Sequence, residues 1–406
     1  MGMIINIDEA LKLRSDYNIL REPLNQMLQN QQEAWEKENP IDLIFNRGSI
    51  SQFQETYTSS IGFEHAFSET SDYAVGPIFN TAEGFSATYR TRTFQGGFII
   101  SQQTLEDRQL GRAKDDANAF IKRWHGDIVE YAMTAIDAGF GVAREFGSGN
   151  DKTKLKLYSA DTTDGAIDTA TKNPLFCKSH SIVKRGEKAL EAKDYQSNMF
   201  YGDVNLMSSD AGRISKLADI INQVITKMEN YKDDNGKYAG VSGAKTIVAA
   251  NDPHLKAALE TALSMDMFKA GDSMIVNPAY KRATVATTPY LGDTNCCGLD
   301  AKGYSKGFFI VDKSYNASNH GPELTERVPL TLEVFDRKEA PKGVKYEGRQ
   351  RFDINVASWR GIAYVYIGTP SQTSSDWNHV DKFTKLTLAD AVATPVTVVN
   401  SAEMKA

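Results

Sequence analysis

Apolar residues recur at three- and four-residue steps between residues 110 and 136, and this spacing predicts one long amphipathic helix. The apolar stripe consists of Leu110, Ala113, Ala117, Phe120, Ile121, Trp124, Ile128, Tyr131, Ala132, Ala135 and Ile136. The stripe is too aromatic and irregular for coiled-coil heptads, and Gly139 and Gly141 favour a helix end just after it. A helix over 111–138 is about 40 Å long at 1.5 Å per residue. Because so long a stripe needs an equally long partner, we expect a pair of strands to lie along it.

Past residue 200, helix-like and strand-like patterns alternate, which predicts a mixed α/β unit. One helix is expected over 214–228, with Ser208 or Ser209 as its N-cap. A second helix is expected from Pro253, with Asp252 as its N-cap, because proline is favoured at the first helical position. Strands are expected at 246–250, 282–287 and 307–311, and two alternating strands follow at 351–356 and 362–367.

Two runs rich in aromatic and β-branched residues predict a hairpin nearer the N-terminus. The runs cover 73–81 and 85–94, and Ala82-Glu83-Gly84 lies between them as the turn. Neither face of the second run is apolar enough for a domain core. A long hairpin of this kind is marginal alone and needs a partner surface. The alternative is an ordinary surface hairpin.

Both ends of the chain have weaker patterns. Residues 1–48 are polar and rich in Gln and Asn, and short apolar patches that include Leu20 and Leu24 are interrupted by Pro23 and Pro40. We expect an arm that packs on another surface, with the folded body beginning after residue 50; the alternative is a frayed tail. Residues 370–406 begin as a Ser/Thr-rich linker and contain a β-prone stretch at 396–399 that the pattern does not place.

Composition narrows the function classes. The 406 residues are 41% hydrophobic and 24% charged, which suits two or three structural units. A net charge of −6 argues against a dedicated high-affinity DNA-binding domain, but not against weak lining of a DNA-filled cavity. The three cysteines form no C-x-x-C pair, so synthesis in a reducing cytosol is expected. No apolar run approaches the ~18 residues of a membrane span, and the N-terminus lacks the features of a secretory signal.

Catalytic and metal motifs are present only as fragments. Gly139-Phe-Gly141 begins a dinucleotide-binding pattern, but Arg144 occupies the third glycine position. Asp233-Asp-Asn-Gly236 resembles part of a calcium loop, but no acid stands two residues before it, so a tight turn is the better interpretation. Cys177 and His180 have no second pair of zinc ligands at suitable spacing. We therefore expect no catalytic residue, cofactor or metal, although motif analysis does not detect a triad scattered along a chain.

The run Asn173-Pro-Leu-Phe-Cys-Lys-Ser-His-Ser181 resembles a segment of the major head subunits of tailed bacteriophages, especially the Mu-like ones. The order of elements around it is similar to that of the Hong Kong-97-type capsid fold over nearly the whole chain. The resemblance implies an α+β fold with an N-terminal arm, an extended hairpin loop, a long spine helix in a peripheral domain, and a mixed α/β axial domain.

The same resemblance divides the chain into segments. These are the arm (1–48), the start of the peripheral domain (49–67), the extended hairpin loop (68–103), the peripheral domain with the spine helix (104–200), the axial domain (201–330), the return strands of the peripheral domain (331–369) and a C-terminal tail (370–406). The return strands are expected to pack beside the spine helix.

The function implied is a major capsid protein that self-assembles, as pentamers and hexamers, into an icosahedral shell around double-stranded DNA contacted without sequence preference. The expected partners are further copies of the chain, a separate scaffolding protein, a portal and a cementing protein; the expected location is the virion capsid, assembled in the bacterial cytoplasm. Two alternatives stay open. One is an encapsulin-like compartment that holds a protein cargo, and the other is a soluble hydrolase with a dispersed active site.

In this family the hairpin lies across the adjacent subunit, which makes its side chains candidates for contacts between subunits. The candidates are Phe79, Phe85, Tyr89, Arg90, Arg92 and Phe94, with Leu20 and Leu24 of the arm. Arg90 and Arg92 are expected to pair with acidic groups of the neighbour. Some members of the fold join subunits through a hairpin lysine and an asparagine. This chain has no lysine between Ser68 and Gln103, so a shell without covalent links is expected.

Overall fold

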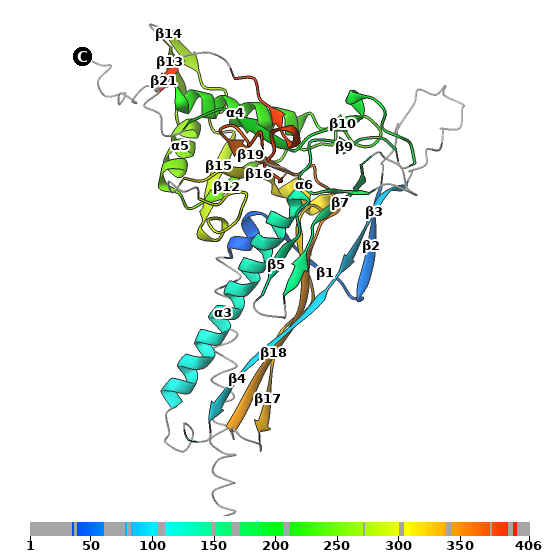
Figure 1. Cartoon of the computed structure of the whole chain (residues 1–406), viewed down its shortest axis with the longest axis vertical. Helices are drawn as coiled ribbons and strands as arrows, with labels where there is room; N and C mark the ends of the chain where they lie inside the picture. Colours follow the sequence, from blue (N-terminus) through cyan, green and yellow to red (C-terminus); the bar gives the residue numbers. More distant parts are fainter. Residues whose placement is uncertain are drawn as a thin grey trace, which may run out of the picture.

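The computed structural model is elongated, with an α/β body from which a helix and a ribbon of strands extend (Figure 1). It describes residues 35, 39–60, 78, 83–101, 103, 110–147, 152–163, 171–184, 186–205, 212–270, 273–299, 304–337, 343–373, 376–388 and 393–395. None of the helices in these ranges combines the length and apolarity needed to cross a bilayer.

The body is built on a six-stranded mixed sheet with the order β15-β12-β16-β19-β11-β20. Its strands are β11 (Met199–Gly202), β12 (Lys245–Ala250), β15 (Ala283–Thr288), β16 (Gly307–Asp312), β19 (Ile362–Ile367) and β20 (Thr384–Lys385). Every residue of β16 is buried, which explains its uninterrupted apolar run. The predicted strands at 246–250, 282–287 and 307–311 are confirmed to within a residue or two.

Two helices of the body match the predicted periodicity. They are α4 (Arg213–Glu229) and α5 (Pro253–Ser264). The Asp252 side chain accepts a hydrogen bond from the His254 N–H at 2.9 Å and so caps α5 as expected. The N-cap of α4 is Gly212 rather than Ser208 or Ser209. Both serines lie outside the described residues.

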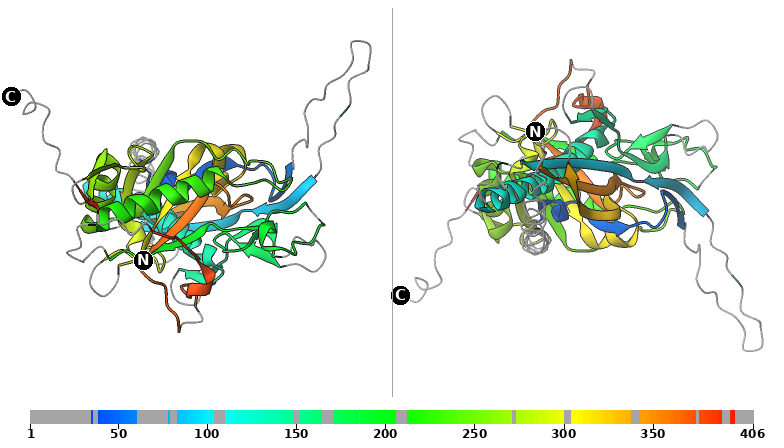
Figure 2. Two further views of the ribbon diagram at one scale, coloured as in Figure 1. Left: turned by 90° about the horizontal axis from the view of Figure 1, so that it is seen from above. Right: turned by 90° about the horizontal axis from the view of Figure 1, so that it is seen from below.

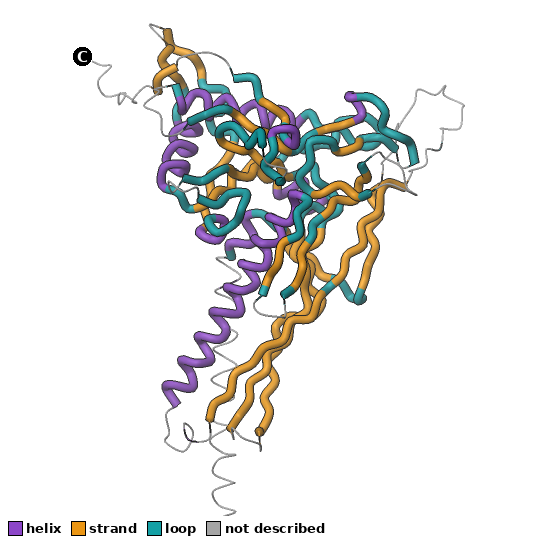
Figure 3. The backbone as a smooth tube through the Cα atoms, in the orientation of Figure 1, coloured by secondary structure: helices purple, strands orange, loops and turns teal. Residues whose placement is uncertain are grey.

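The second unit is a four-stranded sheet that runs along the long helix α3 (Leu110–Asp137), as Figures 1 and 3 show. Its order is β1-β17-β18-β4, formed by β1 (Asn46–Ser49), β17 (Glu323–Arg337), β18 (Gly343–Asn355) and β4 (Arg92–Ser101). Aromatic pairs join helix and sheet, with ring centroids 5.2 Å apart for Phe94–Tyr131 and 5.1 Å for Phe98–Phe120. The helix and its strand partner are confirmed, and the fold class is α+β as predicted.

The helix end is also confirmed. A short 3-10 turn, η2 (Ala138–Phe140), follows α3, and Gly141 takes a φ of 81°, the left-handed conformation that glycine adopts at least cost.

The hairpin prediction was wrong about its first strand. β3 (Glu83–Arg90) pairs antiparallel with β2 (Gln54–Ser60), a strand that the prediction did not include. Glu83 and Gly84, expected in the turn, begin β3. Of 73–81, only Ile78 is described. β2 escaped detection because its sequence, Gln-Glu-Thr-Tyr-Thr-Ser-Ser, has no apolar alternation. The second predicted run is split, since β4 leaves the hairpin to join the long sheet.

The boundary of the arm was wrong as well. The described part before residue 50 forms the 3-10 turn η1 (Pro40–Leu43) and β1, and β1 pairs parallel with β17. The side chains of Ile41, Ile44 and Phe45 are fully buried in the main core. The core therefore begins at about residue 41, because Pro40 starts a capped turn instead of interrupting an arm.

Two further corrections concern the C-terminal region. β19 lies between β16 and β11 in the body sheet, whereas the resemblance implied a return strand beside the spine helix; β18 does take that position. The segment after residue 370 is not a plain linker, because Trp377, Phe383 and Leu386 are buried in the core. Residues 396–399 lie outside the described ranges.

Smaller elements complete the fold. Three two-stranded pairs are β5 (Arg144–Phe146) with β6 (Thr153–Leu155), β7 (Tyr158–Thr162) with β8 (Lys172–Pro174), and β9 (His180–Ser181) with β10 (Tyr195–Gln196). A three-stranded sheet has the order β14 (Ser273–Val276), β13 (Met267–Ala270), β21 (Ala393–Pro395). Short helical turns are η3 (Ala192–Asp194), η4 (Pro289–Leu291), α6 (Lys313–Ser318) and η5 (Val380–Lys382).

Candidate functional site

The motif at 173–181 forms part of a buried polar cluster. His180 of β9 lies between Asp161 of β7 and Asn198, which precedes β11, and all three are almost completely buried. The His180 Nδ1 is 3.1 Å from Asp161 Oδ2, and the His180 Nε2 is 3.2 Å from Asn198 Oδ1. The ring also stacks on Trp359, with centroids 4.1 Å apart and planes 8° from parallel. The cluster thus joins segments that are far apart in the sequence.

Both ring nitrogens of His180 face acceptors. The Asn198 amide is oriented by its Nδ2, which donates to the carbonyl oxygens of Leu175 at 2.8 Å and Ile362 at 3.3 Å, while Oδ1 accepts from the Cys177 N–H at 3.0 Å. A carboxylate only accepts. The ring is therefore held by polar partners on both sides, and the nitrogen that faces Asp161 donates to a buried carboxylate.

The Asp161 carboxylate is held in its charged form by this pairing. Burial by itself raises its pKa, but the attraction of His180 and hydrogen bonds from His180, Ser159 and Asn173 outweigh burial, so the pKa lies below its ordinary range. The Asn173 Nδ2 donates to Asp161 Oδ2 at 2.6 Å. The first and eighth residues of the motif therefore bind the same carboxylate.

This cluster lacks the arrangement of a catalytic triad. The Ser159 Oγ donates to Asp161 Oδ1 at 2.5 Å and is thus bound to the acid, whereas a nucleophile is bound to the histidine. The two His180 nitrogens face Asp161 and Asn198, and neither faces a hydroxyl. Across the described residues, no group of three or more His, Cys, Asp or Glu side chains is placed to hold a metal ion. The cluster fixes the position of strands.

The hairpin residues proposed for contacts between subunits are partly covered within the chain. Phe85 is 6% exposed and Tyr89 1% exposed, in a small cluster with Ala87, Ala160 and Ala357. This corrects the expectation that neither hairpin face is apolar enough for a core. Because their surfaces are already covered, these two aromatic side chains anchor the hairpin to the body and are not free to bind a neighbour.

The two hairpin arginines also have partners in their own chain. The Arg92 Nε lies 2.9 Å from Asp353 Oδ2, and the Arg90 Nε donates to Gln54 Oε1 at 3.0 Å. Tyr131 donates to the other Asp353 oxygen at 2.5 Å. Burial raises the pKa of Asp353, and this effect exceeds the lowering by the Tyr131 hydrogen bond and by Arg92. The expected acid for Arg92 is thus within the subunit, while Arg90 stays exposed.

The remaining candidates have mixed positions. Phe94 is half-buried and stacks on Phe352 at 4.6 Å between centroids, so it belongs to the contact of sheet and helix. Phe79, Leu20 and Leu24 lie outside the described residues, and their roles stay predictions.

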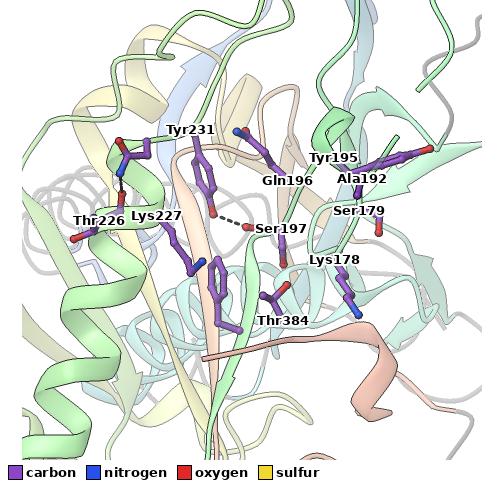
Figure 4. Close-up of a pocket in the computed structure, with 12 residues that line it drawn as sticks. Lys178, Ser179, Ala192, Tyr195, Gln196, Ser197, Thr226, Lys227, Tyr231 and Thr384 are labelled. Atoms are coloured by element: carbon purple, nitrogen blue, oxygen red, sulfur yellow. Dashed lines mark hydrogen bonds between the residues drawn. The ribbon is translucent and has the colours of Figure 1, made fainter. Parts of the chain in front are cut away.

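A groove on the body was not predicted from the sequence. It has a volume of about 590 Å³ and lies between the segment after β8, the strand β10, the C-terminal end of α4, and β20 (Figure 4). Phe200 and Tyr231 form buried parts of its wall, and the Tyr231 hydroxyl donates to the Ser197 carbonyl at 2.7 Å. Lys178 and Lys227 are exposed on opposite sides of it. Among the described residues that line it there is no carboxylate.

No protein-family model matches the chain, and no curated protein matches it. Solved structures do match. A chain from Mycobacterium phage Patience is 14% identical, with a TM-score of 0.43, and the match covers 90% of this chain and 93% of that one. A chain of the satellite phage P4 procapsid, which includes the size determination (Sid) protein, is 12% identical, with a TM-score of 0.40 and coverage of 89% and 98%.

A virus-like particle from Pyrococcus furiosus also matches, with 8% identity, a TM-score of 0.40 and coverage of 86% of this chain and 98% of that one. At these identities and TM-scores the matches carry no weight on function. The function proposed below therefore rests on the residues and elements of this chain.

Proposed function

We propose that this chain is a major capsid protein whose copies form an icosahedral shell of pentamers and hexamers around double-stranded DNA. The observation that supports this best is the extended architecture. At 1.5 Å per residue the 28 residues of α3 span about 42 Å, and at 3.3 Å per residue the 13 residues of β18 span about 43 Å. Helix and ribbon of equal length extend together from the body, a shape that exposes surface to neighbours.

The sequence order supports the same proposal. Arm, hairpin, spine helix, the 173–181 motif, a mixed α/β unit and a return strand follow one another as in the Hong Kong-97-type fold that the chain resembles. Assembly is then geometric: each extended element overlaps a neighbour, and closed symmetry repeats modest contacts many times. A scaffolding protein, a portal and a cementing protein are the further partners of such a shell.

DNA inside this shell would be held weakly. With a net charge of −6 the chain cannot neutralise many phosphates, so contacts depend on local cations and carry no sequence information. A non-enzymatic role fits the closed polar cluster around His180, which offers neither a free base nor a nucleophile.

Electron microscopy and sedimentation of the purified protein test the proposal. The protein, expressed alone and with the scaffolding protein of its own virus, should form shells, capsomers or tubes. Particles from infected cells should contain double-stranded DNA; a protein cargo would instead indicate a compartment. A stable 44.9 kDa monomer under every condition would contradict the proposal.

A further inference from the structure

The three-stranded sheet β14-β13-β21 carries an apolar patch that nothing in the described chain covers. Met274, Ile275 and Val276 follow one another in β14 and are 53%, 43% and 69% exposed. Consecutive residues of a strand point to opposite faces, so both faces of β14 are open. β14 is also an edge strand with unpaired backbone groups. Met267 of β13, 40% exposed, and the exposed Asp266 lie beside it.

An open apolar edge strand is a binding surface that proteins normally cover. The groove described above has the complementary features. Its 590 Å³ is within the range of sites that accept ligand groups, and Ala192 and Tyr195 contribute accessible apolar surface to its lining. It is bordered by β10, whose only paired neighbour among the described strands is β9, so one edge of β10 is free for an added strand.

Charge also matches. Lys178 and Lys227 face the groove with no ion-pair partner in the described chain, and the patch brings Asp266, which likewise has none. Both surfaces therefore gain a counter-ion when they meet.

The two surfaces cannot meet within one chain. Figure 1 shows β13 and β14 at one end of α4 and β10 at the other. Figure 2, viewed from above, shows α4 lying lengthwise, with the β21 strand of that sheet at one end. The 17 residues of α4 span about 25 Å. A β13–β14 hairpin that occupies the groove must therefore belong to another molecule.

We propose that the β13–β14 hairpin of one copy docks in the groove of the next copy, head to tail. Because the two surfaces differ, each copy uses one surface on each side, and such contacts close into a ring when the rotation between copies divides a full turn, as in the pentamers and hexamers of the proposed shell. This inference rests on the proposed shell function and assigns one of its contacts.

Two variants separate the surfaces. In the hairpin variant, Met274→Asp and Val276→Asp place charge on side chains that are more than half exposed, so the fold should persist by circular dichroism. In the groove variant, Lys178→Glu and Lys227→Glu reverse both cations. Each variant alone should lose at least tenfold in assembled particles by sedimentation velocity. Lys154→Glu with Lys256→Glu, two exposed lysines outside the groove, is the charge-matched control and should assemble normally.

Mixing the two variants gives the sharper result. Each retains one competent surface, so a head-to-tail contact predicts a 1:1 heterodimer of twice the 44.9 kDa chain mass and nothing larger. Normal particles from the groove variant, or a mixture without heterodimer, would overturn the inference. If only the hairpin variant failed to form particles, hairpins would meet each other or bind a scaffold, and the proposed contact would be wrong. A wild type that never assembles would instead remove the proposed function.

Discussion

Two buried histidines of this chain have opposite environments. His180 lies between a carboxylate and an amide oxygen. His125 of α3 stacks on Trp35, with ring centroids 4.6 Å apart. The Arg47 guanidinium lies over the Trp35 ring, 5.3 Å from its centroid. Burial lowers the pKa of His125 to about 4, so this ring is neutral at pH 7. His180 stabilises the fold through its polar partners, and His125 does so through its stacking on Trp35.

Replacement of Asp161 with Asn should be strongly destabilising. The change removes the buried carboxylate that binds His180, Ser159 and Asn173, and each hydrogen bond to a charged group contributes about 1.5–3 kcal/mol. Chemical unfolding followed by circular dichroism measures the difference. The matched control is Glu145→Gln, which breaks the exposed pair with Lys152 and should change the stability far less, because water and salt screen an exposed pair. Equal effects of the two variants would show that the Asp161 pair contributes no more than a surface pair.

Acidification should weaken the fold through His125. Its pKa is about 4 when folded and about 6.5 when unfolded, so the unfolded chain binds the proton more readily. The stability from neutral His125 is complete above pH 6.5 and declines as the pH falls toward 4. His125→Phe keeps an aromatic ring against Trp35 and should reduce the fall in Tm between pH 7 and pH 5. The exposed His254→Phe is the control, and a reduction of the same size there would contradict the assignment.

Among the elements, those with a regular apolar period were predicted correctly, and those without one were missed. The helices α3, α4 and α5 were placed within a residue or two because their apolar spacing is regular and Asp252, Pro253 and Gly141 mark ends. β2 was missed because its side chains are mostly polar and its register depends on a strand some thirty residues away. Trp377 and Phe383 were missed because isolated aromatic residues in a Ser/Thr-rich stretch show no period.

The candidate site was even less accessible from the sequence. The 173–181 motif was found, but its chemistry depends on Asp161, Asn198 and Trp359, which only the folded chain brings together. The groove combines four separate segments and has no local signature. Of the hairpin candidates, Phe85 and Tyr89 were noticed for their aromatic character, yet it is packing on Ala160 and Ala357 that decides their role.

The N-terminal boundary can be tested by truncation. A chain that begins at residue 34 retains Trp35 and every core residue that the structure describes, so the body should fold with little change in Tm. A chain that begins at residue 46 loses the fully buried Ile41, Ile44 and Phe45. Since removal of one large buried side chain costs about 2–5 kcal/mol, this truncation should abolish folding. Circular dichroism and solubility of both chains give the comparison, and a folded shorter chain would restore the original boundary near residue 48.

The pairing of β4 with β18 and the stability of α3 can be tested with one glycine each. A Cβ on Gly97 would lie 2.4 Å from the Tyr346 carbonyl oxygen, so Gly97→Ala forces two paired strands apart. A Cβ on Gly126 of α3 meets nothing within 4 Å, and Gly126→Ala should stabilise the helix by roughly 0.5–1 kcal/mol. We expect a lower Tm for the first and a higher Tm for the second. A stable Gly97→Ala protein would show that β4 does not pair with β18 at this register.

At the scale of the whole molecule, extended shape and uncovered surface belong together. Arg92, Phe85 and Tyr89 have their contact partners within the same chain, so these residues set the angle of the hairpin. Contacts with a neighbouring subunit must then come from other surfaces. Among the described surfaces, the open edge of β14 and the groove at the far end of α4 most clearly lack a partner within the described chain. We therefore expect surfaces of the body to contribute more to assembly than the sequence analysis of the hairpin predicted.

The shell should hold without covalent links between subunits. A link of the kind known in this fold needs a hairpin lysine with a neutral amine that attacks an asparagine of the neighbour. The corrected hairpin starts at Gln54, and the sequence from there to Gln103 contains no lysine. Arg90 and Arg92 stay protonated and are not nucleophiles. Apolar burial between subunits must then supply the strength. Boiled and reduced particles should run as one band at the monomer mass on a denaturing gel. A ladder of oligomers that survives the reductant would place the link at a lysine elsewhere, and peptide mass spectrometry of the upper bands would identify it.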